Sequence, residues 1–326
     1  MENISHEAKN ILSIISNYGP IRPVDIAKKA IISTKNLFKH LEKLLNEGLI
    51  SKQGSAPEVY YQYSEKQIWI RGIFDKNDQY IENNYIYVSP NGQIIRGVCG
   101  FETWCIKNKF DFEKEKKKYI QNSQKINRLK RSQLISAKKI ILSGKKELFL
   151  SNIYFSDFYT FAHFGKTKLG QLVYVAKASQ NKELILEVVK YVKPSINKLI
   201  EKHKINLICF VPPTIQRKVQ FMEVFRKLLD LQQKEIEINK VKALTLVAQK
   251  SLRKLEDRIQ NAQKSISINP NQVIDQNILI IDDATGSGAT LNETAKKLKK
   301  IAQKQVKIFG YTIIGSYKGF DVISEV

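Results

Sequence analysis

The sequence predicts an α/β protein in which a parallel sheet occupies the C-terminal half and a small helix-plus-hairpin module precedes it. From about residue 150 onward, apolar strand-like runs alternate with helix-like segments, which is typical of a parallel sheet covered on both faces. Residues 1–64 instead show three helical patterns and then two strand patterns. Residues 65–149 combine strand-like segments with a strongly basic helical run. We therefore expect three parts, the last of them 150–326.

The first part carries three short helical patterns. They lie in the segments 5–19, 23–30 and 33–50, each with apolar residues at helical spacing. The segment 49–64 reads as two strands around a Gly-Ser-Ala-Pro turn. Three helices followed by a hairpin resemble a winged helix-turn-helix, and this resemblance implies binding of nucleic acid, most simply DNA.

The third of these helices is the expected DNA-reading element, because the corresponding helix of such modules enters the major groove. Lys35, Lys39 and Lys43 are four residues apart and share one face, with Asn36 and His40 beside it. The alternative is a solvated lysine face on a protein–protein module. Residues 1–64 hold eight bases and six acids, so this part is only mildly basic.

The middle part is expected to start with strands and to continue as a long helix. Residues 65–100 read as β-rich, with a hairpin turn at 90–92, and residues 100–142 read as one helical stretch. Between Lys107 and Lys146 there are fourteen lysines and arginines against three acids. A basic helix of this kind suits a phosphate backbone. The residues expected to contact nucleic acid here are Lys125, Arg128, Lys130 and Arg131.

The whole chain has 54 basic and 31 acidic residues and a formal net charge of +23. Such an excess attracts polyanions, of which nucleic acid is the foremost candidate; a lysine-rich genome is the alternative explanation. No apolar run is long enough to span a membrane, and the first residues lack a signal-peptide pattern, so we expect a cytoplasmic protein with no membrane partner. Three scattered cysteines favour neither disulfides nor a zinc site.

The last part alternates strands and helices without an internal repeat. The expected strands are 171–177, 205–213, 276–284 and 306–316, and the expected helices are 181–203, 222–233 and 288–303.

The segment "ILIIDDATGSGATLNE" (278–293) carries the clearest chemistry. Four aliphatic residues lead into Asp282 and Asp283, and two adjacent carboxylates at the end of a buried strand need compensation. In open α/β sheets, ligands lie at the carboxyl ends of strands. The small-residue loop 284–290 opens a helix, whose first N–H groups favour an anion. The segment thus suits a phosphorylated sugar; the alternative is an ordinary turn with two exposed acids.

Two other phosphate-binding loops fit this segment less well. A Walker A loop requires a lysine that is absent, and a dinucleotide-binding loop requires a glycine where Leu291 stands.

The segment "ILIIDDATGSGAT" resembles the phosphoribosyl-pyrophosphate (PRPP) motif of type I phosphoribosyltransferases. The resemblance implies that the two acids bind the ribose hydroxyls and that the loop binds the 5′-phosphate. The implied PRPP-binding residues are Asp282, Asp283, Ala284, Thr285, Gly286, Ser287, Gly288, Ala289 and Thr290. Gly286 stands where the family usually has a threonine, so one hydroxyl donor is missing.

Residues 150–320 are also similar to the ComF-like subgroup of that family. "YVAKASQNKELI" resembles its first strand, lysine and loop, with Lys177 facing the pyrophosphate. "CFVPPTIQRKVQFMEVF" resembles its proline-ended strand and basic loop, which contains Arg217. The segment 239–268 resembles its mobile hood, with Gln249, Leu252, Arg258 and Asn261 in the expected order. The residues 219–222 depart from the subgroup's Arg-Gly-Phe-Asn stretch, and its zinc ribbon is absent.

The resemblance implies a catalytic set of Asp282, Asp283, Lys177 and Arg217. The cofactor expected with PRPP is Mg²⁺, held through PRPP near the two acids and not by direct protein ligands. On the hood, the cations expected to close over the pyrophosphate are Lys240, Lys242, Lys250 and Arg253.

Three functions remain open from the sequence. The first is a PRPP-dependent phosphoribosyltransferase tethered to nucleic acid, acting as the effector of a bacterial defence system of the retron type. The second is a winged-helix transcriptional regulator that senses PRPP without catalysis. The third is a ComF-like role in DNA uptake. Besides nucleic acid and PRPP, the partners left open are a reverse transcriptase, another defence-system subunit and a second copy of the chain.

Overall fold

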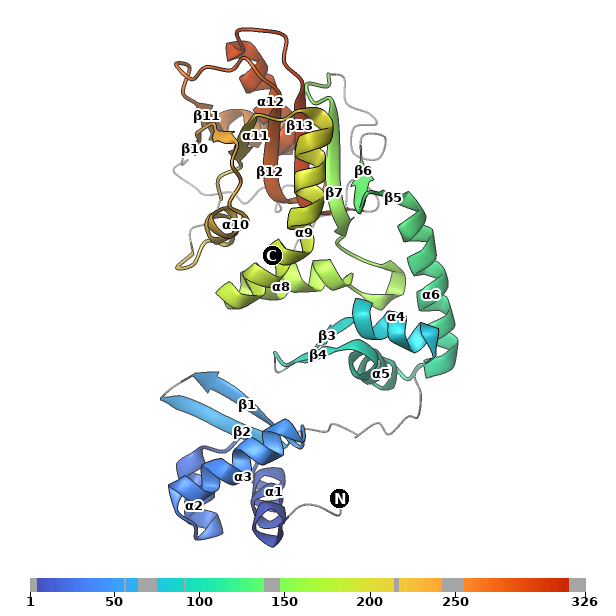
Figure 1. Ribbon diagram of the computed structural model, residues 1–326, viewed down its shortest axis with the longest axis vertical. Helices are drawn as coiled ribbons and strands as arrows, with labels where there is room; N and C mark the ends of the chain where they lie inside the picture. The colour runs from blue at the N-terminus through green and yellow to red at the C-terminus, as the bar shows by residue number, and fades with distance from the viewer. Residues whose placement is uncertain are drawn as a thin grey trace. The chain divides into compact units, whose positions relative to one another are not determined.

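The computed structural model describes residues 5–55, 57–63, 75–90, 92–137, 147–213, 217–241 and 255–316. The chain divides into two compact units, Met1–Phe74 and Asp75–Val326. Both are drawn in Figure 1, the first in blue and the second from cyan to red.

The N-terminal unit has the predicted order of three helices and a hairpin. Its elements are α1 (His6–Tyr18), α2 (Pro23–Ala30), α3 (Thr34–Asn46), β1 (Ile50–Ser55) and β2 (Glu58–Tyr63). Two serines begin helices: the side chain of Ser5 accepts a hydrogen bond from the N–H of Ala8, and that of Ser33 accepts one from Asn36. Leu37 on α3 is completely buried. The winged-helix prediction is confirmed.

The second unit is built on a seven-stranded sheet in the order β5-β6-β7-β13-β12-β8-β9. Its strands are β5 (Lys130–Arg131), β6 (Leu134–Ser136), β7 (Asn152–Phe158), β8 (Leu207–Phe210), β9 (Lys234–Glu235), β12 (Ile278–Thr285) and β13 (Ile308–Gly315). The strands from β7 to β9 pair in parallel, whereas β5 and β6 add an antiparallel hairpin at one edge. The predicted α/β class with a mainly parallel sheet is confirmed.

Four short strands and nine further helical segments surround this sheet in the described part of the chain. The strands form two hairpins, β3 (Ile86–Val88) with β4 (Ile94–Arg96) and β10 (Ile238–Lys240) with β11 (Ile266–Ile268). The helices are α4 (Lys76–Asn84), α5 (Gly97–Lys107), α6 (Phe112–Leu129), η1 (Ala162–Phe164), α8 (Lys168–Ser179), α9 (Lys182–His203), α10 (Phe221–Leu229), α11 (Leu255–Ser265) and α12 (Ala289–Ile301).

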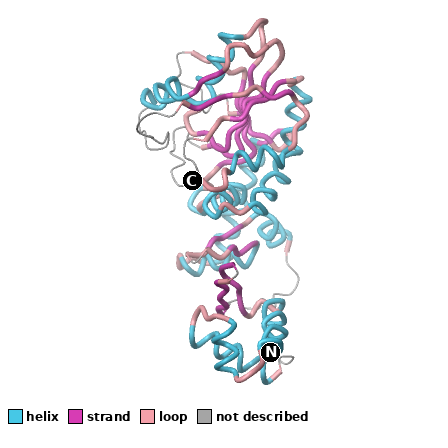
Figure 2. Tube along the Cα trace, turned by 90° about the vertical axis from the view of Figure 1, so that its left-hand side faces the viewer, coloured by secondary structure: helices cyan, strands magenta, loops and turns pink. Residues whose placement is uncertain are grey.

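Helices cover both faces of the sheet, as Figure 2 shows. Alternate residues of β12 point to opposite faces. Leu279 and Ile281 pack with α8, α9 and α10, whereas Ile278 and Ile280 pack with α11 and α12. Burial on both faces explains why the first four residues of this strand are all apolar and do not alternate with polar ones.

The strand predicted at 171–177 is wrong, because these residues lie in α8. The hydroxyl of Thr167 accepts a hydrogen bond from the N–H of Gly170 and begins the helix. Leu169, Leu172, Val173 and Ala176 recur at helical spacing and are buried against the sheet. The first parallel strand is instead β7, a segment that the sequence analysis left unassigned.

The single helix predicted over 100–142 is also wrong. It is two helices, α5 and α6, followed by the β5–β6 hairpin. The side chain of Asp111 accepts a hydrogen bond from the N–H of Lys114 and starts α6 as a separate helix. Within the region predicted to be β-rich, 65–100, residues 76–84 belong to α4 and residues 97–100 to α5, whereas the hairpin around residues 90–92 is confirmed as β3 and β4. Residues 65–74 of this region lie outside the described residues.

Candidate functional site

The two aspartates lie at the end of β12, the strand with β13 on one side and β8 on the other. Regular pairing with β8 stops at Ile281, whereas pairing with β13 continues to Thr285. Asp282 and Asp283 therefore extend beyond the end of one neighbouring strand. Each residue is partly buried, and both lie at the carboxyl edge of the sheet, where ligands of parallel sheets bind.

One distant segment brings a cation to Asp283, and another contacts that segment. The Nζ of Lys177, in the last turn of α8, donates to Oδ2 of Asp283 at 2.5 Å. The guanidinium of Arg217 donates to the backbone carbonyl of Lys177 at 2.6 Å. The side chain of Gln180 accepts a hydrogen bond from the N–H of Val219 at 2.7 Å. The structure thus brings Lys177, Arg217 and Asp283 together, and Gln180, which the sequence analysis did not select, ties the segment after Arg217 to the end of α8.

Burial, and after it the neighbouring charge of Asp283, raises the pKa of the Asp282 carboxyl to about 8. The N–H of Asp283, which donates to Oδ1 of Asp282 at 2.8 Å, and the cations Lys240 and Lys177 oppose part of this rise. Burial lowers the pKa of the Lys240 amine on β10, and the two acids oppose that shift. The acid pair is therefore compensated by two lysines from separate elements.

The loop after the acids presents backbone N–H groups. Thr285 and Ser287 are buried, with exposed fractions of 4% and 6%. Gly288 has φ 65°, in the left-handed region that glycine adopts without strain, and α12 begins at the next residue without a side-chain cap. No group in the described ranges accepts a hydrogen bond from the N–H of Gly286, Ser287 or Gly288. An anion with several oxygens could take these donors.

The remaining loop residues lie at the helix start. Ala284 and Thr290 are partly buried, and Ala289 is buried. The N–H of Ala289 makes a long hydrogen bond of 3.4 Å to the hydroxyl of Ser287. The nine residues implied by the PRPP motif thus form one continuous strand end, loop and helix start.

Part of the predicted hood can be described. Lys240 ends β10, which pairs with β11, and Asn261 lies on α11. The Nζ of Lys297 on α12 donates to the backbone carbonyls of Gln263 and Ile266 and ties α11 and β11 to α12. The predicted hood residues Lys242, Gln249, Lys250, Leu252 and Arg253 and the side chain of Arg258 lie outside the described part.

The predicted DNA-reading face lies on α3. Lys35, Asn36, Lys39 and Lys43 are exposed. His40 is less accessible, because its Nε2 lies 3.0 Å from a carboxylate oxygen of Glu7 on α1. This face can contact phosphates through its lysines, whereas His40 is already used to join two helices.

The basic stretch of the second unit is not a uniform positive surface. Lys125, Arg128 and Arg131 are exposed, but the Nζ of Lys130 is 2.9 Å from Oδ2 of Asp157. Lys116 is buried and forms ion pairs with Asp78, Glu113 and Asp75. Part of the predicted basic helix therefore has a structural role, because buried charges require partners.

Comparison with known proteins finds a similarity in the first unit. Residues 4–56 match the model of the MarR family. The match spans the three helices and β1 and supports a winged helix consistent with nucleic-acid binding. No curated protein matches the chain. In the described ranges, no helix has the length and apolarity needed to cross a membrane.

Proposed function

We propose that the Asp75–Val326 unit binds PRPP through Asp282, Asp283 and the loop 284–290, and that the MarR-like unit binds duplex DNA through α3. One observation carries the proposal of PRPP binding. Two partly buried carboxylates lie next to three adjacent N–H groups, and no described residue accepts a hydrogen bond from these N–H groups. A ribose 5-phosphate offers hydroxyls to the former and phosphate oxygens to the latter. The type I phosphoribosyltransferase fold is part of this proposal.

The other residues near the site suit the pyrophosphate of PRPP. Lys177 adjoins Asp283, and Arg217 adjoins the carbonyl of Lys177, so one cation lies beside the acids and a second lies next to the residue that carries it. Binding would exchange the Lys177–Asp283 ion pair for contacts to the ligand: the ribose hydroxyls would donate to Asp283, and Lys177 would donate to pyrophosphate. The site would thus exchange one set of charge contacts for another and leave no buried charge unpaired.

A divalent cation fits this arrangement. The described residues include no cluster of three histidine, cysteine or acidic side chains able to hold a metal. Mg²⁺ prefers oxygen ligands and keeps several waters, so one or both acids, water and the phosphates of PRPP would hold it. When bound, the cation would offset the charge of the pyrophosphate.

Catalysis is the first form of the proposal. Transfer would break the bond from ribose C1 to the pyrophosphate oxygen, whose electrons leave with pyrophosphate, while a nucleophile bonds to C1. Lys177 and Arg217 would stabilise the departing charge, which is the main contribution available from fixed groups. A transferase of this kind, tethered to nucleic acid, could serve as the effector of a defence system.

Sensing without turnover is the second form. The MarR match supports a regulator, and the Lys177–Asp283 pair is a contact that bound PRPP would break. In this form, PRPP would change the affinity of α3 for a duplex without release of pyrophosphate. The DNA-uptake role has no separate structural observation in its favour.

Isothermal titration of the full chain with PRPP and Mg²⁺ tests the binding proposal. Wild type should give saturable heat, and Asp283→Asn should lower the affinity at least tenfold. Asp275→Asn is the matched control, because Asp275 is also partly buried, lies just before β12 and makes no ion pair with a described residue. Absence of heat with wild type, or an equal loss in both variants, would refute PRPP binding.

A pyrophosphate-release assay with candidate bases and nucleotides separates the two forms. Release that Asp283→Asn abolishes supports catalysis. PRPP-dependent release of a duplex without pyrophosphate production supports sensing.

A further inference from the structure

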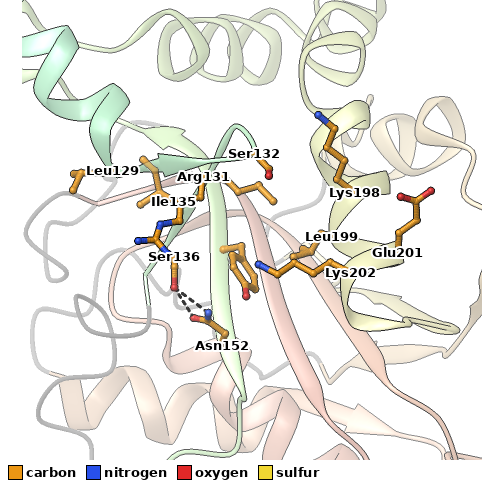
Figure 3. Close-up of a pocket in the computed structure, with 12 residues that line it drawn as sticks. Leu129, Arg131, Ser132, Ile135, Ser136, Asn152, Lys198, Leu199, Glu201 and Lys202 are labelled. Atoms are coloured by element: carbon orange, nitrogen blue, oxygen red, sulfur yellow. Dashed lines mark hydrogen bonds between the residues drawn. The ribbon is translucent and has the colours of Figure 1, made fainter.

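A hollow lies at the antiparallel edge of the sheet, and none of its lining residues belongs to β12 or to the loop after it. It has a volume of about 730 Å³ and is lined by the β5–β6 hairpin, the start of β7 and the last turns of α9. Two strands, β7 and β13, separate β6 from β12. This sheet-edge pocket, shown in Figure 3, therefore does not belong to the proposed PRPP site.

The floor of the pocket is apolar. Leu134, Tyr154 and Leu199 line it and are buried, and Leu129 at its margin is 48% exposed. The hydroxyl of Tyr154 is already bonded to Nε2 of His203 at 2.9 Å. The ring is thus fixed in place, and the floor offers an apolar surface for the flat face of a nucleobase.

The rim is basic. Arg131 comes from the hairpin, and Lys198 and Lys202 come from α9; Figure 3 shows them around the hollow together with the single acid Glu201. All four side chains are exposed, and within the described ranges the three cations have no ion-pair partner. Lysines near a helix C-terminus also complement the helix dipole, but that role does not account for Arg131 or for the hollow.

The positive charge continues outside the pocket. On α6, Lys125 lies four residues before Leu129, on the same side of the helix, and Arg128 follows it. Both are exposed, and neither has an ion-pair partner in the described part. A strand of nucleic acid could therefore extend from the pocket along α6, whereas a single mononucleotide could not reach both places.

We infer that the sheet-edge pocket binds single-stranded nucleic acid, with one base on the apolar floor and the adjoining phosphates at Arg131, Lys198 and Lys202. Stacking of bases combined with a basic path for the backbone is the usual physical basis of single-strand binding. The inference goes beyond the proposed function, because it uses neither the PRPP loop nor α3.

The test is fluorescence anisotropy of the full chain with a labelled twelve-nucleotide oligodeoxythymidine at several salt concentrations. Lys198→Ala combined with Lys202→Ala should weaken binding about tenfold and reduce the slope of log K against log salt by about 1.4, since each phosphate contact on a single strand contributes about 0.7. Lys227→Ala combined with Lys234→Ala is the control, because both lysines are exposed, lie on α10 and β9 away from the pocket and remove the same charge. The control should change affinity less than twofold.

A strand of equal length without bases tests the floor and should bind at least fivefold more weakly than the thymidine strand. Three results would each overturn the inference. The first is an equal loss of affinity in both double variants, and the second is equal affinity for the strands with and without bases. The third is free thymidine monophosphate that competes as well, per nucleotide, as the oligonucleotide does. The heat of PRPP binding should be unchanged in the pocket variant. A protein that fails to bind PRPP can still pass this test, so the two proposals fail separately.

Discussion

The Nζ of Lys177 lies 2.5 Å from Oδ2 of Asp283, and both side chains are partly buried, with exposed fractions of 15% and 23%. The residues are 106 positions apart in the sequence. The contact joins the last turn of α8 to the end of β12. The neighbouring carboxyl of Asp282 has a raised pKa, because of burial and, after it, the charge of Asp283.

Removing the cation should cost both stability and ligand affinity. Lys177→Met keeps the aliphatic stem but leaves Asp283 without its hydrogen-bonded charge partner. We expect the free energy of unfolding to fall by about 2 kcal/mol, the scale of a hydrogen bond to a charged group, and the affinity for PRPP with Mg²⁺ to fall at least tenfold. Denaturant unfolding and calorimetric titration measure the two effects.

The control for this change is Lys182→Met. Lys182 is exposed in the first turn of α9 and has no ion-pair partner in the described chain. It should alter neither quantity appreciably. A Lys177→Met protein with wild-type affinity for PRPP would exclude Lys177 from the pyrophosphate site.

Asp282→Asn should change the dependence of stability on pH. Burial raises the pKa of this carboxyl from 3.8 to about 8, so between these pH values the unfolded chain has lost a proton that the folded chain keeps. The contribution of Asp282 therefore makes the folded state less stable as pH rises through this window. The asparagine variant lacks this loss and should be more stable than wild type at pH 8, on the order of 1–3 kcal/mol, with a smaller difference at pH 4.

Thermal unfolding across pH 4–9 measures this difference, and the same variant should lose PRPP binding. Wild-type affinity for PRPP should rise with pH over pH 6–9, as the carboxylate forms. A variant that is less stable than wild type at pH 8 would show that the charged form of Asp282 is well compensated in the fold.

The sequence predicted those parts of the site that are continuous in the chain. The apolar run of β12, its acids, the loop and α12 follow one another, so local pattern was sufficient. The prediction from sequence failed at α8. A helix packed against a sheet is rich in apolar residues, so the run 172–176 resembles a strand. The contact between Lys177 and Asp283 depends on the packing of α8 against the sheet, and the sheet-edge pocket depends on α9 meeting the hairpin; neither contact leaves a local signal.

Gly288→Ala should strain the loop 284–290. Its φ of 65° costs a residue with a Cβ roughly 1–2 kcal/mol, and relaxation of that strain would turn the neighbouring N–H groups away from a shared anion. We expect a lower melting temperature together with at least tenfold weaker PRPP binding. Differential scanning calorimetry and titration provide the two measurements.

Gly92→Ala separates strain from function. Gly92 has φ 82°, no atom lies within 4 Å of the position that a Cβ would take there, and the residue belongs to the β3–β4 hairpin. The substitution should lower the melting temperature by a comparable amount and leave PRPP binding unchanged. Equal retention of PRPP binding in both variants would argue against the loop as the phosphate site.

Lys35→Ala combined with Lys39→Ala should weaken binding of duplex DNA by the N-terminal unit. Each phosphate contact contributes about 0.9 to the slope of log K against log salt, so the loss of two contacts should reduce that slope by about 1.8. His40→Ala should have a smaller effect on DNA affinity and a larger effect on stability, because His40 contacts Glu7. The matched control, Lys9→Ala combined with Lys28→Ala, removes the same charge from exposed positions on α1 and α2. If both double variants reduced the slope equally, the positive charge of the unit as a whole, and not the α3 face, would account for binding.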